Sequence, residues 1–318
     1  MKKKTMRKHL SILIMTLAAV LMLSCATTGG KAKATLTECP ERMFWRIDGR
    51  DKKGNPSVVY VQGSFHLGDG RMYPLADPVM AAWNSADRLV AEISSTDTAR
   101  LQLKLMELMA DSLKKAGGRI VTDGLTAKQK ATLNKYMDPE VVTNLAAFEP
   151  WLTTYSIAAA IYQGNRLSIE YGLDNTLMTY ASEAGREVEG LDELQCQLDV
   201  ITYGSYDEQM DMLRDLLDEL DAPDEVIAMT NSLYEAYLAN DKAHFAQSSD
   251  EAKKADETRH AFYKAYNKMI YDDRNKDWAK DITGYLREGG TTFIFAGAAH
   301  WTGEGSVFDY LRKMGTME

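Results

Sequence analysis

Short runs of β-branched and aromatic residues alternate with longer amphipathic stretches in this chain, and the pattern predicts an α/β fold. The runs at 43–47 and 58–61 flank a stretch of turn formers and charges, which predicts an antiparallel hairpin. Further short apolar runs at 88–93 and 291–295 predict strands. A helix is expected over 74–86, so that strand, helix and strand at this spacing suggest a βαβ unit.

The middle of the chain, from about 97 to 288, has mostly helical periodicity. The signals for these elements are a cap at Thr96-Asp97 and a stop at Gly117-Gly118, a capping box at Thr126–Gln129, helices within 141–162 and 174–183, a short strand at 186–191, and a break at Ala222-Pro223. We therefore predict a small central mixed sheet, built from both ends of the chain and interrupted by a long, mostly helical insertion.

The N-terminus has the pattern of an export signal. Five basic residues precede the apolar stretch 10–23, which is shorter than the roughly 20 residues that span a bilayer. Ser24-Cys25 and a polar stretch follow. This resembles a bacterial lipoprotein signal, although Met22 stands where leucine is usual. We expect a signal at 1–24, lipidation of Cys25, a flexible tether over 25–40 and one domain over 41–318.

Composition limits the partners of this chain. Its 45% hydrophobic content suffices for a core, and its formal net charge is −9. Removal of residues 1–24 would bring the net charge to −14, which argues against binding nucleic acid. The expected membrane contact is therefore the acyl chains on Cys25, on the exported side. Export would permit a disulfide between Cys39 and Cys196, although Cys196 also fits as a small core residue.

Two G-x-x-H motifs stand at the ends of two predicted strands. Gly63-Ser64-Phe65-His66 follows the apolar run at 58–61, and Gly297-Ala298-Ala299-His300 follows the run at 291–295. Ligands of open α/β sheets bind at the carboxyl ends of the strands. We therefore expect His66 and His300 to share one site, although each could instead bond a loop carbonyl.

Glu92 is the natural third member of that site. It lies near the end of the apolar strand 88–93, where a buried carboxylate needs a partner or a metal ion. Three protein ligands and an open position are typical of hydrolytic metal sites. His66, Glu92 and His300 are therefore candidate ligands for a divalent ion, with Mn, Co or Zn as candidates. No nucleophile elbow, phosphate loop or dinucleotide motif is present.

Several segments, in this order, resemble the TraB/GumN family, which also contains PrgY and the Tiki proteins. The matching stretches are Tyr60–Gly68 with Tyr73-Pro74-Leu75, Ala86–Glu92, Tyr171–Asp174, Asp273-Arg274-Asn275, and Ala296–Gly303. They span about residues 43–315. The resemblance implies a fold like the erythromycin-esterase/ChaN-like group, with both histidines and Glu92 lining one site. Because Tiki members are metal-dependent proteases, it also implies a divalent-metal hydrolase, with a peptidase as the first expectation.

Four further residues are candidates for roles in that site. Members of the family often have Leu-Glu-Thr where this chain has Leu191-Asp192-Glu193, so Asp192 is a shorter candidate carboxylate for catalysis. Arg274 and Asn275 either lie on a solvated helix face or bind substrate and assist catalysis. Asp174 either caps a helix or contacts a site ligand or the substrate. Asp69 is expected to serve a turn, and His244 and His260 to be surface residues.

Two alternatives to a hydrolase remain open at this stage. The same pocket could capture a peptide or small molecule without turnover. It could also capture haem, by analogy with ChaN-like relatives, although no haem-specific motif is present. Family resemblance alone does not fix the reaction.

Overall fold

The computed structural model describes residues 33–163 and 167–318, so the predicted signal and Cys25 lie outside the described residues. The described residues form one six-stranded sheet in the order β1-β2-β3-β6-β4-β5. Its strands are β1 (Thr35–Glu38), β2 (Phe44–Arg50), β3 (Pro56–Ser64), β4 (Arg88–Ile93), β5 (Val188–Asp192) and β6 (Gly290–Gly297). The sheet is mixed and is built from both ends of the chain, as predicted.

The hairpin prediction is confirmed, because β2 pairs antiparallel with β3. β3, β6, β4 and β5 are mutually parallel, with Ser64 opposite Gly297 and Ile93 opposite Asp192. The last strand of the chain, β6, lies between β3 and β4. The two strands of the expected βαβ unit, β3 and β4, are therefore parallel but not adjacent. The predicted tether over 25–40 is too long, because β1 forms from part of it and pairs with β2.

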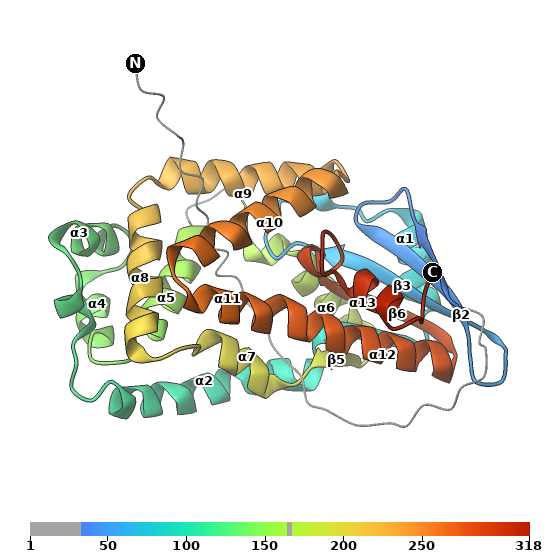
Figure 1. Cartoon of the computed structure of the whole chain (residues 1–318), viewed down its shortest axis with the longest axis horizontal. Coiled ribbons are helices and arrows are strands. Elements are labelled where there is room, and N and C mark those ends of the chain that lie inside the picture. The colour runs from blue at the N-terminus through green and yellow to red at the C-terminus, as the bar shows by residue number, and fades with distance from the viewer. Residues whose placement is uncertain (1–32, 164–166) are drawn as a thin grey trace, which may run out of the picture.

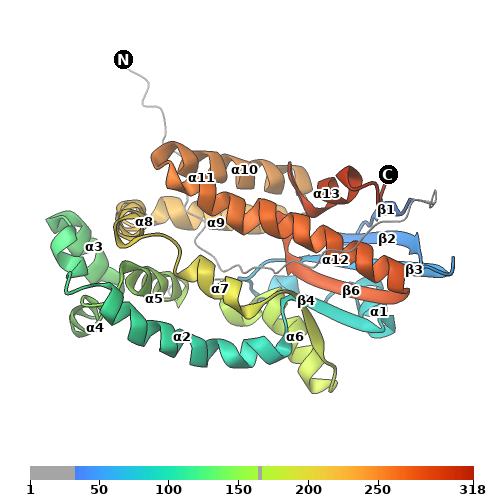
Figure 2. The ribbon, with the colours of Figure 1, turned by 60° about the horizontal axis from the view of Figure 1, so that its bottom comes forward.

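Helices cover both faces of the sheet. Trp278, Ala279, Ile282 and Leu286 give α12 (Arg274–Glu288) an apolar stripe that is buried on one face. Figure 2 shows α12 on that side, and α1 (Asp77–Ser85) and α6 (Leu173–Glu183) on the other. The core between them includes Phe293 and Phe295 of the central strand β6, both fully buried.

The remaining helices form the insertion, which extends from the carboxyl ends of the parallel strands (Figure 1). They are α2 (Ser95–Lys115), α3 (Ala127–Tyr136), α4 (Pro139–Leu145), α5 (Pro150–Gln163), α7 (Leu194–Ile201), α8 (Tyr206–Glu219), α9 (Pro223–Leu238), α10 (Lys242–Arg259) and α11 (Phe262–Asn267), with α13 (Val307–Lys313) after the sheet. The capping box of Thr126 and Gln129 is present, and α9 begins at Pro223 as the predicted break requires. No described helix is long and apolar enough to cross a membrane.

Candidate active site

Four parallel strands deliver one polar residue each to the same end of the sheet. His66 follows β3, Glu92 lies within β4, Asp192 ends β5, and His300 follows β6. Gly297 marks their meeting point: a Cβ built there would lie 3.1 Å from Glu92 Oε1 and 3.8 Å from His66 Nε2, next to the His300 ring. The structure therefore brings together the two G-x-x-H histidines and the strand-end glutamate.

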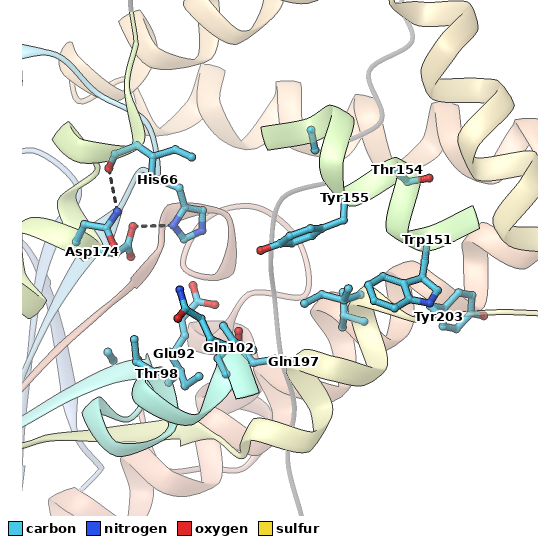
Figure 3. A pocket seen from close by; sticks show the side chains of 18 of the residues that line it. His66, Glu92, Thr98, Gln102, Trp151, Thr154, Tyr155, Asp174, Gln197 and Tyr203 are labelled. Carbon is cyan, nitrogen blue, oxygen red and sulfur yellow. Dashed lines mark hydrogen bonds and ion pairs between the residues drawn. The ribbon is translucent and has the colours of Figure 1, made fainter. Parts of the chain in front are cut away.

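His66 forms a close pair with Asp174. Its Nδ1 lies 2.6 Å from Asp174 Oδ2 (Figure 3). The Ser64 hydroxyl donates to the other carboxylate oxygen. A carboxylate can only accept a hydrogen bond, so Nδ1 carries a proton and Nε2 is the atom left for chemistry. This is the arrangement of an oriented proton-transfer histidine.

Backbone contacts hold this pair in place. Leu173, at the start of α6, donates its N–H to Phe65 O at 3.1 Å, and Gly68 and Ser168 exchange two backbone hydrogen bonds. Gly172 permits the close approach, because a Cβ there would lie only 2.3 Å from His66 O. Gly172 also occupies the N-cap position, so of the two alternatives for Asp174 the helix cap is wrong. The Asp174 side chain faces His66 instead.

Arg274 lies at the centre of a buried polar cluster beneath the pair. It comes directly after a π-helical segment (Lys268–Asp273) and is 1% exposed. Its Nη2 donates to Glu92 Oε2 at 2.7 Å and to Asp192 Oδ2 at 2.6 Å. The indole N–H of Trp278 donates to the other Asp192 oxygen at 2.6 Å. One guanidinium thus bridges the ends of two strands.

His300 is held neutral in this cluster. The amide nitrogen of Asn275 donates to Gly305 O, so its oxygen is the acceptor that lies 2.6 Å from His300 Nδ1. His300 Nδ1 is then protonated, and Nε2 accepts from Arg274 Nη1 at 3.0 Å. Burial and the nearby guanidinium lower the pKa of His300 well below its usual value, which agrees with this tautomer.

The pKa values of the two histidines are therefore shifted in opposite directions. Burial opposes the charged form of His66, but the carboxylates of Asp174 and Glu92 raise its pKa to about 9. Burial would raise the pKa of Asp174, yet His66 brings it below the usual value. For Asp192, burial outweighs Arg274 and raises the pKa to about 7. His66 can exchange a proton, whereas His300 serves the buried cluster.

A pocket of about 630 Å³ opens above the pair, between α2, α5, α6, α7 and the strand ends. His66, Glu92 and Asp174 lie at one end, and Trp151, Tyr155 and Tyr203 lie toward the other (Figure 3). Most of the lining is apolar, and the described residues that line it include no lysine or arginine. Arg274, Asn275, Asp192 and His300 do not line it, so they lie beneath the pocket.

Two of the three predicted metal ligands are bound by Arg274 in this geometry. Arg274 already donates to Glu92 and to the lone pair of His300 Nε2 that a metal ion would need. A divalent ion among these groups would also lie against the guanidinium charge. Within the described ranges, no group of three or more His, Cys, Asp or Glu side chains is arranged to hold an ion. Metal binding by His66, Glu92 and His300 stays a prediction.

Comparisons with known proteins identify the family of this chain. The model of the TraB/PrgY/gumN family matches residues 43–317. The chain belongs to the TraB/PrgY/gumN family. An uncharacterized protein of Treponema pallidum (strain Nichols) also matches this chain. The two sequences are 28% identical over 295 residues, which cover 92% of this chain and 86% of the relative. No solved structure matches.

The structure also shows the positions of several residues for which the sequence left alternatives open. Asp69 caps a short turn and bonds Arg71, as expected. No disulfide joins Cys39 and Cys196, and Cys196 is buried. His244 is exposed, whereas His260 lies 3.4 Å from Asp215. Sequence reasoning missed Ser64 and Trp278 as partners of the site carboxylates. The Ser within Gly63-Ser64-Phe65-His66 was the only local signal available.

Proposed function

We propose that this chain is an exported, lipid-anchored hydrolase that cleaves a carbonyl compound at the His66 end of the pocket. The observation that carries the proposal is the His66–Asp174 pair, with Nδ1 fixed by the carboxylate and Nε2 facing an apolar pocket. The export signal and Cys25 support the anchored location. Peptides and acyl esters are the substrate classes to test first.

The reaction requires one water molecule and two proton transfers. His66 Nε2 takes a proton from water as the oxygen attacks the carbonyl carbon of the substrate. The bond from that carbon to nitrogen or oxygen then breaks, and the leaving group takes the proton from Nε2. Asp174 holds the imidazole in the required tautomer and stabilises its charged form, as in other carboxylate–histidine pairs. Glu92, fixed by Arg274 and Gly297 N–H, orients the water at the same end.

The experiment compares hydrolysis by the chain from Ala26, which keeps every described element, with that by His66→Gln. A fluorogenic peptide library and a series of acyl esters serve as substrates. We expect kcat/KM to fall by roughly 10²–10⁴-fold in the variant, the usual contribution of a positioned proton-transfer group. His244→Gln is the matched control, because His244 is exposed and lies outside the pocket lining. Equal rates in wild type and His66→Gln would contradict the proposal.

A further inference from the structure

Exposed large apolar side chains gather on one part of this molecule. Among the described residues they fall almost entirely between 103 and 180, in α2, α4, α6 and the turns beside them, with Met314 as the exception. They are Leu103, Met106, Met109, Leu113, Ile120, Val141, Ile169, Tyr171 and Tyr180. Figure 2 shows α2, α4 and α6 along the lower side of the molecule. Exposed apolar side chains gathered on one part of a molecule are candidates for an interaction surface.

Helix α2 contributes the longest part of that face. Leu103, Met106 and Leu113 follow one another at helical spacing and are 63%, 64% and 49% exposed. Leu105 and Leu108, on the neighbouring stripe, are only half-buried toward the body. The helix thus has a half-buried apolar stripe and, beside it, a more exposed one.

This face is continuous with the pocket. Thr98, Leu101 and Gln102 of α2 line the pocket wall. Ile169 lines the pocket and is also 47% exposed, so it lies where the pocket meets the surface. The face and the pocket therefore share α2 and Ile169, which gives an apolar molecule a route from one to the other.

The charge of this region differs from that of the chain. Within α2 the basic residues are Arg100, Lys104, Lys114 and Lys115, and the acidic ones are Asp97, Glu107 and Asp111, each of which pairs with a basic residue of the same helix. The helix is therefore net +1 in a chain of net −9. Basic residues beside an apolar stripe are typical of helices that lie in a membrane interface.

We propose that the outer face of α2 lies on a lipid bilayer and delivers an amphiphile with an apolar chain to the pocket. This inference rests on the proposed function for the cleavage step, and names its substrate class. The ester or amide carbonyl of the amphiphile reaches His66, while its chain fills the apolar pocket. Glu92 and Asp174 at the reacting end, with no lysine or arginine among the described lining residues, select against an anionic group beside the carbonyl.

A contact of α2 with the bilayer would complement the proposed lipid anchor. A second, interfacial contact would make a single anchor on Cys25 more stable.

The test is sedimentation of the chain from Ala26 with vesicles of phosphatidylcholine, alone and mixed with phosphatidylglycerol. Three proteins are compared: wild type, the double variant Met106→Glu/Leu113→Glu, and Met314→Glu. Met314 is the matched control, because it is 43% exposed but lies after α13, outside the apolar face. We expect wild type and Met314→Glu to bind vesicles equally, more strongly with phosphatidylglycerol, and the double variant to bind at least tenfold more weakly.

Three results would overturn the proposal: wild type that stays in the supernatant with both vesicles, a double variant that binds like wild type, or a wild-type dimer that the double variant abolishes. The last would assign the face to a second copy. Far-ultraviolet circular dichroism checks that the variants fold. Failure of the cleavage step is separable, because it would leave vesicle binding intact while neither soluble peptides nor acyl esters from acetyl to palmitoyl are hydrolysed. If hydrolysis occurs, its rate should rise with acyl length; preference for acetyl would overturn the substrate class.

Discussion

At the scale of single residues, the site combines one histidine that can exchange protons with one that cannot. His66 is bound to a carboxylate, whereas His300 lies between an amide oxygen and a guanidinium. The same motif, G-x-x-H, thus serves two different purposes in one fold. The difference comes from the partners, Asp174 in one case and Arg274 with Asn275 in the other.

The pH dependence of hydrolysis should report His66. The base form is the neutral imidazole, so kcat/KM is expected to rise with pH and level off above about 9, the pKa to which the neighbouring carboxylates raise it. Asp174→Asn removes one of those anions, which should move this limb to lower pH while the plateau rate falls. A pH–rate profile of both proteins checks this. An unchanged limb in Asp174→Asn would show that another group controls the rate.

Arg274 should be essential for stability. Arg274→Met would leave Glu92 and Asp192 buried without their cation, so we expect a loss of about 3–5 kcal/mol in the free energy of unfolding. Urea denaturation measures it. The control is Arg312→Met, because Arg312 is half exposed in a surface pair with Asp309 and should cost less than about 1 kcal/mol. Similar losses in both variants would contradict the account of the buried cluster.

At the scale of elements, the junction between the β3 loop and α6 positions His66 against Asp174. Gly172→Ala would place a methyl group against His66 O, where a Cβ lies only 2.3 Å away. We expect a loss of about 1–3 kcal/mol in the free energy of unfolding and a lower hydrolysis rate. Gly70→Ala is the control, since nothing lies within 4 Å of a Cβ there. Thermal unfolding and the hydrolysis rate are measured for both variants. Equal stability and equal rates in Gly172→Ala and Gly70→Ala would contradict the role of this junction.

The contact between α10 and α8 should make stability depend on pH. Burial raises the pKa of Asp256 to about 7, and the carboxylate of Glu219 contributes. A raised pKa in the folded state gives stability that is complete below about pH 4 and is lost as pH rises through 7. Asp256→Asn should therefore match wild type at low pH and exceed its free energy of unfolding by about 4 kcal/mol at pH 8. Asp207→Asn, at an exposed position, is the control.

Local patterns predicted five of the six strands and the position of the two histidines, because each depends on a few neighbouring residues. β4 spans the predicted Arg88–Ile93, and Glu92 lies near its end as expected. Long-range pairing was not predictable in this way. Asp174 joins His66 across 108 residues, and its position near a helix start resembled a cap.

The burial of Arg274 shows the same limit. Its neighbours Asp272, Asp273 and Lys276 are polar, so the local pattern fits a solvated helix as well as a site. Only the packing of α12 onto the sheet turns this arginine inward, between carboxylates from β4 and β5. The family resemblance pointed to Arg274 and Asn275, but it did not show that they lie beneath the pocket.

At the scale of the whole molecule, the sheet and the helical insertion supply different parts of the site. The sheet ends hold the polar cluster, and the insertion supplies the apolar walls and the exposed face of α2. The central claim is that hydrolysis depends on the His66–Asp174 pair above a cluster organised by Arg274. The competing prediction places a metal ion on His66, Glu92 and His300.

The most direct measurement is turnover of acyl esters and fluorogenic peptides by metal-stripped protein, with and without added Mn, Co or Zn ions. Wild type, His66→Gln and His244→Gln are compared, and bound metal is quantified in each sample. The account predicts turnover in stripped wild type and His244→Gln, loss in His66→Gln, and no stoichiometric ion. Turnover that appears only with a bound ion, or none under any condition, would contradict it.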